Sequence, residues 1–433
     1  MLDIPLGLPA KVRKAIYGLT NAPRAWWASV CETFQKLGLI RLRTDAASWI
    51  IKDPRTGSVV GNVIGHVDDF LIMGDHGNGC FTRVRAAIAA AYRWSPWQLG
   101  EFVYAGIRIR QRMDFSITLD QQEYLDNLEA VKIAEYRVPM DKEPLTAAEV
   151  SELRGVLGAI QWPATQLSPH LSAELSMLQS SLAKPTVADL KAANKLLKYT
   201  KKDSRRQLTI FTHGFCHWQD LCLMAWTDAA VANRPDLSST GGQVMGMARR
   251  DQFVDGKMSQ ITLLAWSSRK LRRVARSSLA AEVQALAEGA DNLWLARLQW
   301  AEFNGFDVSK GNEDAAVRAS RGLLITDAKS IYDAITRSET QGLGLQEKQS
   351  ALELLGVKEQ IQRDGTDLRW VHSQAQLADG LTKVGARPVI EKFLEEQLWA
   401  CKYDPAFESA KKRSQARKPV FADVVGGFSN GVE

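Results

Sequence analysis

Long apolar runs and cysteines are both scarce in this sequence. No run approaches the roughly 18 apolar residues that a membrane-spanning helix needs, and the first residues, MLDIPLGLPAKVRK, lack the apolar core and cleavage site of a secretory signal. The 433 residues contain five cysteines, an odd and widely spaced set that argues against a disulfide framework. We therefore expect an intracellular protein, cytoplasmic or nuclear, with no membrane partner.

A large net charge is missing as well. The 55 basic and 49 acidic side chains leave a net charge of +6, which does not by itself indicate a polyanionic partner. Hydrophobic residues make up 45% and charged residues 24%, a balance that excludes a mainly disordered, collagen-like or coiled-coil chain. Since a domain usually takes roughly 100–200 residues, we expect two to four domains.

The first half of the chain mixes short apolar runs with turns. Residues 63–73 predict two short strands with Asp68 and Asp69 near the turn between them, and residues 100–110 and 115–119 predict further strands. Apolar residues at helical spacing predict that 146–200 is mostly helical. The polar, basic stretch 200–206 is suited to a linker.

The second half has a different order of elements. Strands are predicted at 221–226, 241–247 and 261–266, followed by a long helix at 279–303, a strand at 323–325, helices from 329 and at 345–363, a strand at 367–371 and a last helix after 373. The fold class is therefore a multidomain α+β and α/β chain. The end of the chain, with KKRSQARK at 411–418, is expected to be a basic disordered tail.

Four acidic residues stand where predicted strands end or helices begin: Asp228, Glu282, Asp327 and Asp379. A carboxylate just past an apolar strand lies at the edge of a sheet, where a ligand can reach it. Four carboxylates brought together need cations to stay ionised, and Mg²⁺ prefers such oxygens. Each one taken alone is more simply a surface acid, because one sequence does not show convergence in space.

The sequence motifs around these acids resemble those of a known protein family. WTDAA (226–230), AWSS (265–268), SSLAAEVQALA (277–287), TDAKSI (326–331) and QLADGLTK (376–383) are similar to the ribonuclease H domain of copia-type retrotransposon polyproteins. The resemblance runs from Leu221 to about Arg387. It implies a mixed five-stranded sheet with flanking helices, in which the four acids are catalytic and bind two Mg²⁺ or Mn²⁺ ions for phosphodiester hydrolysis.

His372 matches a histidine that some ribonucleases H carry ahead of the last aspartate, where it helps to release product or to move a proton. A plain surface histidine is the alternative. The chain also departs from the family pattern: Ala280 stands where a second glutamate is usual, and QEKQS at 346–350 replaces a histidine-rich phrase. Neither departure touches the four acids.

The first half resembles the reverse transcriptase of the same family. KAIYGLTNAPRAW (14–26) is similar to the segment lining the nucleotide and template site, HVDDFLI (66–72) to the paired-aspartate hairpin, and GEFVYAGI (100–107) to the strands that grip the primer end. The resemblance implies that Asp68 and Asp69 bind metal. Nucleotide addition needs a third carboxylate from an earlier strand, and Asp3 is a poor substitute, so we expect a truncated polymerase without a complete site.

Four regions follow from these resemblances. We expect the palm remainder and thumb of a truncated reverse transcriptase at 1–135, and a helical connection with a basic linker at 136–206. The segment that begins SELRGVLG (151–158) resembles the connection that precedes the ribonuclease H domain in this family, which supports the second region. A ribonuclease H-like domain is expected at 219–387, and a C-terminal helix with the basic tail at 388–433.

Basic residues cluster beside the expected helix that carries Glu282. The segment RKLRRVAR (269–276) supplies five bases, and phosphate contacts from such a cluster give sequence-independent affinity for nucleic acid. The alternative is that these residues only form a solvent-exposed helix face. The predicted nucleic-acid-binding residues are Arg269, Lys270, Arg272, Arg273, Arg276, Lys14 and Arg24.

The leading hypothesis is a retrotransposon-derived fragment that cuts the RNA strand of an RNA–DNA hybrid with Mg²⁺ or Mn²⁺. The 2′-hydroxyl and the duplex shape would mark the RNA strand. Two alternatives stay open: an inactive remnant that binds nucleic acid without chemistry, and a full RNA-directed DNA polymerase whose N-terminus is missing from the gene model. The remainder of a Pol polyprotein is a possible partner, and the oligomeric state is open.

Overall fold

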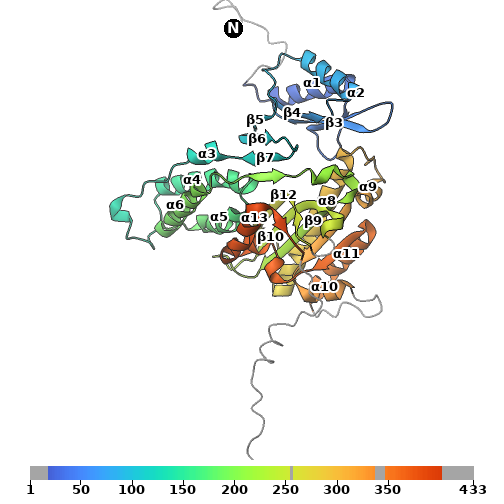
Figure 1. The fold of residues 1–433 in the computed structure, drawn as a ribbon. Helices are drawn as coiled ribbons and strands as arrows, with labels where there is room; N and C mark the ends of the chain where they lie inside the picture. The colour runs from blue at the N-terminus through green and yellow to red at the C-terminus, as the bar shows by residue number, and fades with distance from the viewer. Residues whose placement is uncertain (1–17, 254–256, 337–346, 402–433) are drawn as a thin grey trace, which may run out of the picture.

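The computed structural model describes residues 18–253, 257–336 and 347–401 (Figure 1). It is a mixed α/β structure with several sheets, as the sequence predicted at that level. Lys14 and the expected basic tail lie outside the described residues. Among the described helices, none combines the length and the apolar character needed to cross a membrane.

The first unit is a small α/β layer at the N-terminal end of the described chain (Figure 1). Asn78 caps its second helix by accepting hydrogen bonds from the backbone N–H groups of Cys80 and Phe81. Phe34 and Trp49 are buried between the helices and the sheet. The antiparallel sheet has the order β1-β2-β3-β4, and the elements are α1 (Ala22–Lys36), β1 (Ile40–Arg41), β2 (Ser48–Lys52), β3 (Val59–His66), β4 (Asp69–Gly74) and α2 (Gly79–Ala91).

A second antiparallel sheet follows, and its fourth strand comes from a distant segment. Strand β8 pairs with β7, so the chain returns to this sheet after a layer of helices. The strands are β5 (Glu101–Tyr104), β6 (Ile107–Gln111), β7 (Ile117–Asp120) and β8 (Leu208–Ile210), and the helices are α3 (Gln122–Asp126), α4 (Ala147–Gln166), α5 (Ser172–Ser180) and α6 (Val187–Lys202).

The stretch predicted as a basic linker, 200–206, contains the last turn of α6 and the turn that follows it. Asp203 in that turn accepts a hydrogen bond from the Arg206 side chain at 2.6 Å and contacts the buried His170 at 3.1 Å. The segment is therefore tied to the helical layer through its acidic residue.

The third unit is a five-stranded sheet of order β12-β10-β9-β13-β14, in which β9, β10 and β12 run antiparallel and β9, β13 and β14 run parallel. Its strands are β9 (Leu221–Ala230), β10 (Thr240–Arg249), β12 (Thr262–Lys270), β13 (Arg321–Thr326) and β14 (Thr366–Trp370). Every residue of β9 is buried, because it is the central strand and both faces of the sheet are covered.

Helices cover both faces of this sheet (Figure 1). One face packs on α8 (Ser278–Phe303), α10 (Lys329–Thr336) and α11 (Lys348–Asp364). The other packs on α12 (Asp379–Thr382) and α13 (Arg387–Glu396). Four short elements were not predicted from the sequence: α7 (Arg250–Phe253), α9 (Glu313–Ala319), β11 (Ser259–Gln260) and β15 (Leu398–Trp399), the last two forming a two-stranded sheet.

Glu302, near the end of α8, joins the third unit to the first. Its carboxylate is 6% exposed and accepts hydrogen bonds from the backbone N–H groups of Arg43 and Thr44, at 2.7 and 3.0 Å, and from the Thr44 hydroxyl at 2.6 Å. Lys52 adds a hydrogen bond to the carbonyl of Gly305 at 2.7 Å. The first unit is thereby held against the C-terminal end of α8.

Replacing Glu302 by Ala is expected to lower the free energy of unfolding by about 2 kcal/mol, because two partly buried backbone donors and the Thr44 hydroxyl lose their charged acceptor. Urea denaturation of the whole chain measures this loss. Glu32→Ala, which removes an exposed ion pair with Lys36, is the matched control and is expected to leave stability unchanged. Equal stability of the Glu302 variant and wild type would contradict the role of this junction.

Candidate metal centre

Asp228 lies on the central strand β9 with its side chain 1% exposed. The parallel strand β13 pairs with β9 so that Ile325 stands opposite Trp226. Continuing that register by two residues sets Asp327, just past the end of β13, level with Asp228. The backbone carbonyl of Asp327 is fixed by the indole N–H of Trp370, at 3.0 Å. Strand pairing therefore brings the first and third predicted acids together.

Two glycines let helices approach the sheet at this place. A Cβ on Gly289 of α8 would lie 2.2 Å from the Thr227 side chain, so only glycine allows this close contact of helix and strand. A Cβ on Gly242, which pairs with Asp228 across β10 and β9, would lie 2.6 Å from Thr382. The first contact sets the approach of α8, which carries Glu282, and the second sets the approach of α12.

Helix α8 begins where the sequence predicts. Ser277 caps it, its hydroxyl accepting a hydrogen bond from the N–H of Ala280 at 3.0 Å. Glu282 therefore lies in the first turns of the helix, at the end that meets β9. It is partly buried there.

Three of the four predicted acids converge. Carboxylate oxygens of Asp228, Asp327 and Asp379 all lie within 4.8 Å of one another. Glu282 is next to them, since the charges of Asp228 and Asp327 act on its carboxyl group. Hard carboxylate oxygens at this spacing are the donor set that Mg²⁺ and Mn²⁺ prefer, so the residues present fit a divalent cation.

Burial and mutual repulsion disfavour the ionised form of three of these acids. Burial raises the pKa of Glu282 to about 9, with Asp228 and Asp327 adding to the effect. Burial, together with the nearby charge of Asp379, also raises the pKa of Asp228 and that of Asp327. The protein therefore does not fully neutralise these carboxylates, and a bound cation would stabilise their ionised form.

Two residues that the sequence analysis did not single out complete the centre. The hydroxyl of Thr382 donates a hydrogen bond to Asp228. The ammonium of Lys383 lies 2.6 Å from Asp379 Oδ1 and 3.4 Å from Asp228 Oδ2. Burial lowers the pKa of Lys383, but the carboxylates of Asp228 and Asp379 outweigh burial and raise it. Both residues belong to the motif QLADGLTK, and their position near Asp379 in this motif is the sequence signal that could have identified them.

Gln376 connects this segment to the central strand. Its side chain is fully buried, donates a hydrogen bond to the carbonyl of Thr227 at 2.9 Å, and accepts one from the N–H of Ala378 at 3.3 Å. Its amide thus holds the loop before α12 against β9, one residue from Asp228. Gln376 is also a residue that sequence reasoning missed.

His372 lies in the loop between β14 and α12 and is partly buried. Its Nδ1 accepts a hydrogen bond from the N–H of Gln374 at 3.2 Å, which gives it a local capping contact. It is outside the group of three acids whose oxygens converge. A role for His372 in catalysis stays a prediction.

Asp68 and Asp69 lie on the exposed turn between β3 and β4, where Asp69 pairs with His66. Val67 in this turn has a φ of 57°, and its carbonyl accepts a hydrogen bond from the indole of Trp26 at 2.7 Å. Within the described ranges, no third acidic, histidine or cysteine side chain joins the two aspartates in a metal-binding group. Metal binding by this pair stays a prediction.

The predicted basic residues at 269–276 are exposed, and three of them contact acids. Arg269 pairs with Glu288 and Lys270 with Asp236, each at 2.6 Å, and Arg273 pairs with Glu353. A phosphate would have to compete with these carboxylates. Arg24 is exposed on α1. Nucleic-acid binding by these side chains stays a prediction, as it does for Lys14, which is outside the described residues.

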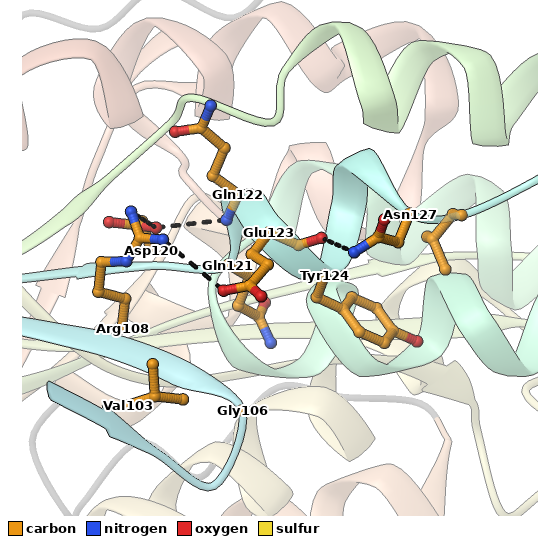
Figure 2. Close-up of a pocket in the computed structure, with 10 residues that line it drawn as sticks. Val103, Gly106, Arg108, Asp120, Gln121, Gln122, Glu123, Tyr124 and Asn127 are labelled. Carbon is orange, nitrogen blue, oxygen red and sulfur yellow. Dashed lines mark hydrogen bonds and ion pairs between the residues drawn. The ribbon is translucent and has the colours of Figure 1, made fainter.

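A separate hollow of about 480 Å³ lies between the β5–β6 turn and α3 (Figure 2). On its wall Arg108 stands between two carboxylates, 4.0 Å from Asp120 and 3.8 Å from Glu123. Gln121 is 4% exposed, and neither polar atom of its amide has a hydrogen-bond partner within the described part of the chain. A buried amide in that state costs stability.

Gln121→Leu is therefore expected to raise the free energy of unfolding by about 1 kcal/mol, since leucine fills a similar volume without an unmet hydrogen bond. Urea denaturation tests this, with Gln122→Leu on the rim of the same hollow as the control. A clear loss of stability in the Gln121 variant would mean that the amide is hydrogen-bonded in solution.

No family model matches the chain. Its homologues among curated proteins are retrovirus-related Pol polyproteins. It is 24% identical over 400 residues to the Pol polyprotein from transposon RE1 of Arabidopsis thaliana, a match that covers 88% of this chain and 24% of that protein. It is also 24% identical over 274 residues to a putative transposon Ty5-1 protein of Saccharomyces cerevisiae, covering 60% of this chain and 81% of that protein. The chain spans about a quarter of the length of the plant relative.

Solved structures with local likeness include the ribonuclease H domain of PFV, at 15% identity, covering 38% of this chain and 93% of that one, with a TM-score of 0.24. A foamy viral protease–reverse transcriptase in complex with an RNA/DNA hybrid matches at 9% identity, covering 86% of this chain and 62% of that one, with a TM-score of 0.26.

Proposed function

Because the homologues of this chain are retrovirus-related Pol polyproteins of transposons, we propose that its five-stranded unit is a ribonuclease H that cuts the RNA strand of RNA–DNA hybrids. The observation that carries the proposal is the convergence of Asp228, Asp327 and Asp379 within 4.8 Å at one edge of the sheet. Glu282 lies beside them on α8. These are the four acids that the motif resemblance assigned to catalysis.

In this proposal Asp228, Asp327, Asp379 and Glu282 hold two divalent cations, Mg²⁺ or Mn²⁺. Ions held by these carboxylates would supply an activated water and would neutralise charge on the phosphate. The protein groups position them. Asp228 is fixed by β9 and by Thr382, and Asp327 by Trp370. The contact from Thr382 on α12 orients the Asp228 carboxylate and the contact from Trp370 on β14 fixes the backbone of Asp327, so less reorganisation is needed on binding.

The remaining predictions form the wider proposal. Residues 219–387 are the ribonuclease H-like domain, 136–206 a connection, and 1–135 the palm and thumb of a reverse transcriptase. His372 helps product release or proton movement, and exposed bases such as Arg272 and Arg276 contact the phosphates of the hybrid. DNA synthesis is not part of the proposal, and metal binding by Asp68 and Asp69 stays a prediction.

Removal and return of metal test this function. Purified protein in EDTA is expected to leave a hybrid intact, and Mg²⁺ or Mn²⁺ added in excess is expected to restore cutting. Double-stranded DNA and double-stranded RNA of the same sequence are the control substrates and should stay whole. Cutting that persists in EDTA, or an intact hybrid at every metal concentration, would contradict the proposal.

A further inference from the structure

The ammonium of Lys383 lies beside two of the three converging acids. Its ammonium lies 2.6 Å from Asp379 Oδ1 and 3.4 and 3.5 Å from the two carboxylate oxygens of Asp228. Asp228 and Asp379 belong to the group whose oxygens lie within 4.8 Å of one another. A single positive charge therefore bridges two of the three converging acids.

The placement is built into the backbone. The N–H of Lys383 donates to the carbonyl of Asp379 at 3.0 Å, which closes the last turn of α12 and fixes where the side chain starts. The preceding residue, Thr382, is buried and also donates to Asp228. The side chain of Lys383 is 47% exposed, so its ammonium has a path to solvent that requires no movement of α12.

We propose that Lys383 is a tethered counterion that holds the acids together in the metal-free protein and is displaced by the first divalent cation. This inference rests on the metal centre of the proposed function. Mg²⁺ binds carboxylate oxygens at roughly 2.0–2.1 Å, and an ammonium hydrogen-bonded to the same two side chains would repel it at short range. The metal and Lys383 therefore exclude each other.

Two consequences follow for the protein. Without metal, the acids keep a positive partner, so the centre stays folded rather than repelling itself apart. To bind, a metal ion must attract the carboxylates more strongly than the Lys383 ammonium does. A divalent cation meets this condition better than a monovalent one. Lys383 thus sets the metal concentration at which the centre fills.

The direct test is the chemical accessibility of Lys383. Wild-type protein is acylated with an amine-reactive reagent in EDTA and in saturating Mn²⁺, digested at acidic residues and quantified by mass spectrometry. Lys383 is expected to react at least threefold more in Mn²⁺. Lys191, which pairs with Asp141 at 2.6 Å far from the centre, is the internal control and should react equally in both conditions.

Calorimetric Mn²⁺ titration of Lys383→Met gives the second readout. The variant is expected to bind Mn²⁺ about tenfold more tightly than wild type and to melt at a lower temperature than wild type in EDTA, whereas Lys191→Met should match wild type in both. Equal reactivity of Lys383 with and without Mn²⁺, or unchanged affinity in Lys383→Met, overturns this inference alone when wild type binds Mn²⁺. Failure of wild type to bind Mn²⁺ overturns the metal centre itself.

Discussion

Replacing Asp228 by Asn is expected to reduce the rate of hybrid cleavage by about 10³-fold or more, the scale on which essential catalytic groups act. Asparagine is nearly the same size as aspartate and keeps an oxygen that accepts the Thr382 hydrogen bond. It removes the negative charge at the centre of the acid group. Metal-dependent catalysis should therefore fail while the fold persists.

Three measurements separate this outcome from unfolding. The melting temperature of Asp228→Asn in EDTA should equal or exceed that of wild type, because a buried carboxyl group whose pKa is raised by burial is replaced by a neutral amide. Hybrid binding should persist. Asp141→Asn, in an exposed ion pair with Lys191, is the matched control and should cut at the wild-type rate. Wild-type cutting by the Asp228 variant would remove this residue from the site.

Replacing Arg297 by Met is expected to lower the free energy of unfolding by about 3–5 kcal/mol. The guanidinium is fully buried and donates to the carbonyls of Val317, Ser320 and Asp364 at 2.8–2.9 Å, and to the hydroxyl of Thr366. These acceptors come from α9, from Ser320 between α9 and β13, from the end of α11 and from the start of β14. Methionine fills part of the space but donates no hydrogen bond, so the carbonyls of Ser320 and Asp364 lose the guanidinium, and a buried acceptor without a partner is costly.

Chemical denaturation of the whole chain measures this loss, and Arg318→Met serves as the control. Arg318 is exposed on the neighbouring helix α9, so its replacement should change stability by no more than about 0.5 kcal/mol. Similar losses in both variants would show that Arg297 has no special role. Because Arg297 is 15 residues from Glu282 on the same helix, the variant also tests whether α8 is held by this contact.

The sequence predicted the elements of the third unit well, because each has a strong local signal. Strand β9 is a continuous apolar run, and α8 combines a serine cap with an apolar stripe. The paired aspartates were correctly placed at a turn between two strands, now β3 and β4. Such signals depend on residues that are close in sequence.

Features that depend on distant residues were not predictable. The register between β13 and β9 sets Asp327 beside Asp228, yet no periodicity encodes that register. Strand β8 joins a sheet whose neighbouring strand lies about 90 residues earlier. Lys383 contacts Asp228 only because α12 lies across Gly242. For the four acids, resemblance of the surrounding motifs supplied what local patterns did not.

The most direct measurement of the central claim is strand-specific cleavage of one RNA–DNA hybrid, labelled in separate experiments on the RNA and on the DNA strand, in Mg²⁺. We expect wild type to cut the RNA strand internally, to leave the DNA strand whole, and to lose this activity in Asp228→Asn. An RNA strand that stays intact with wild type, or that is cut equally by Asp228→Asn, would contradict the account.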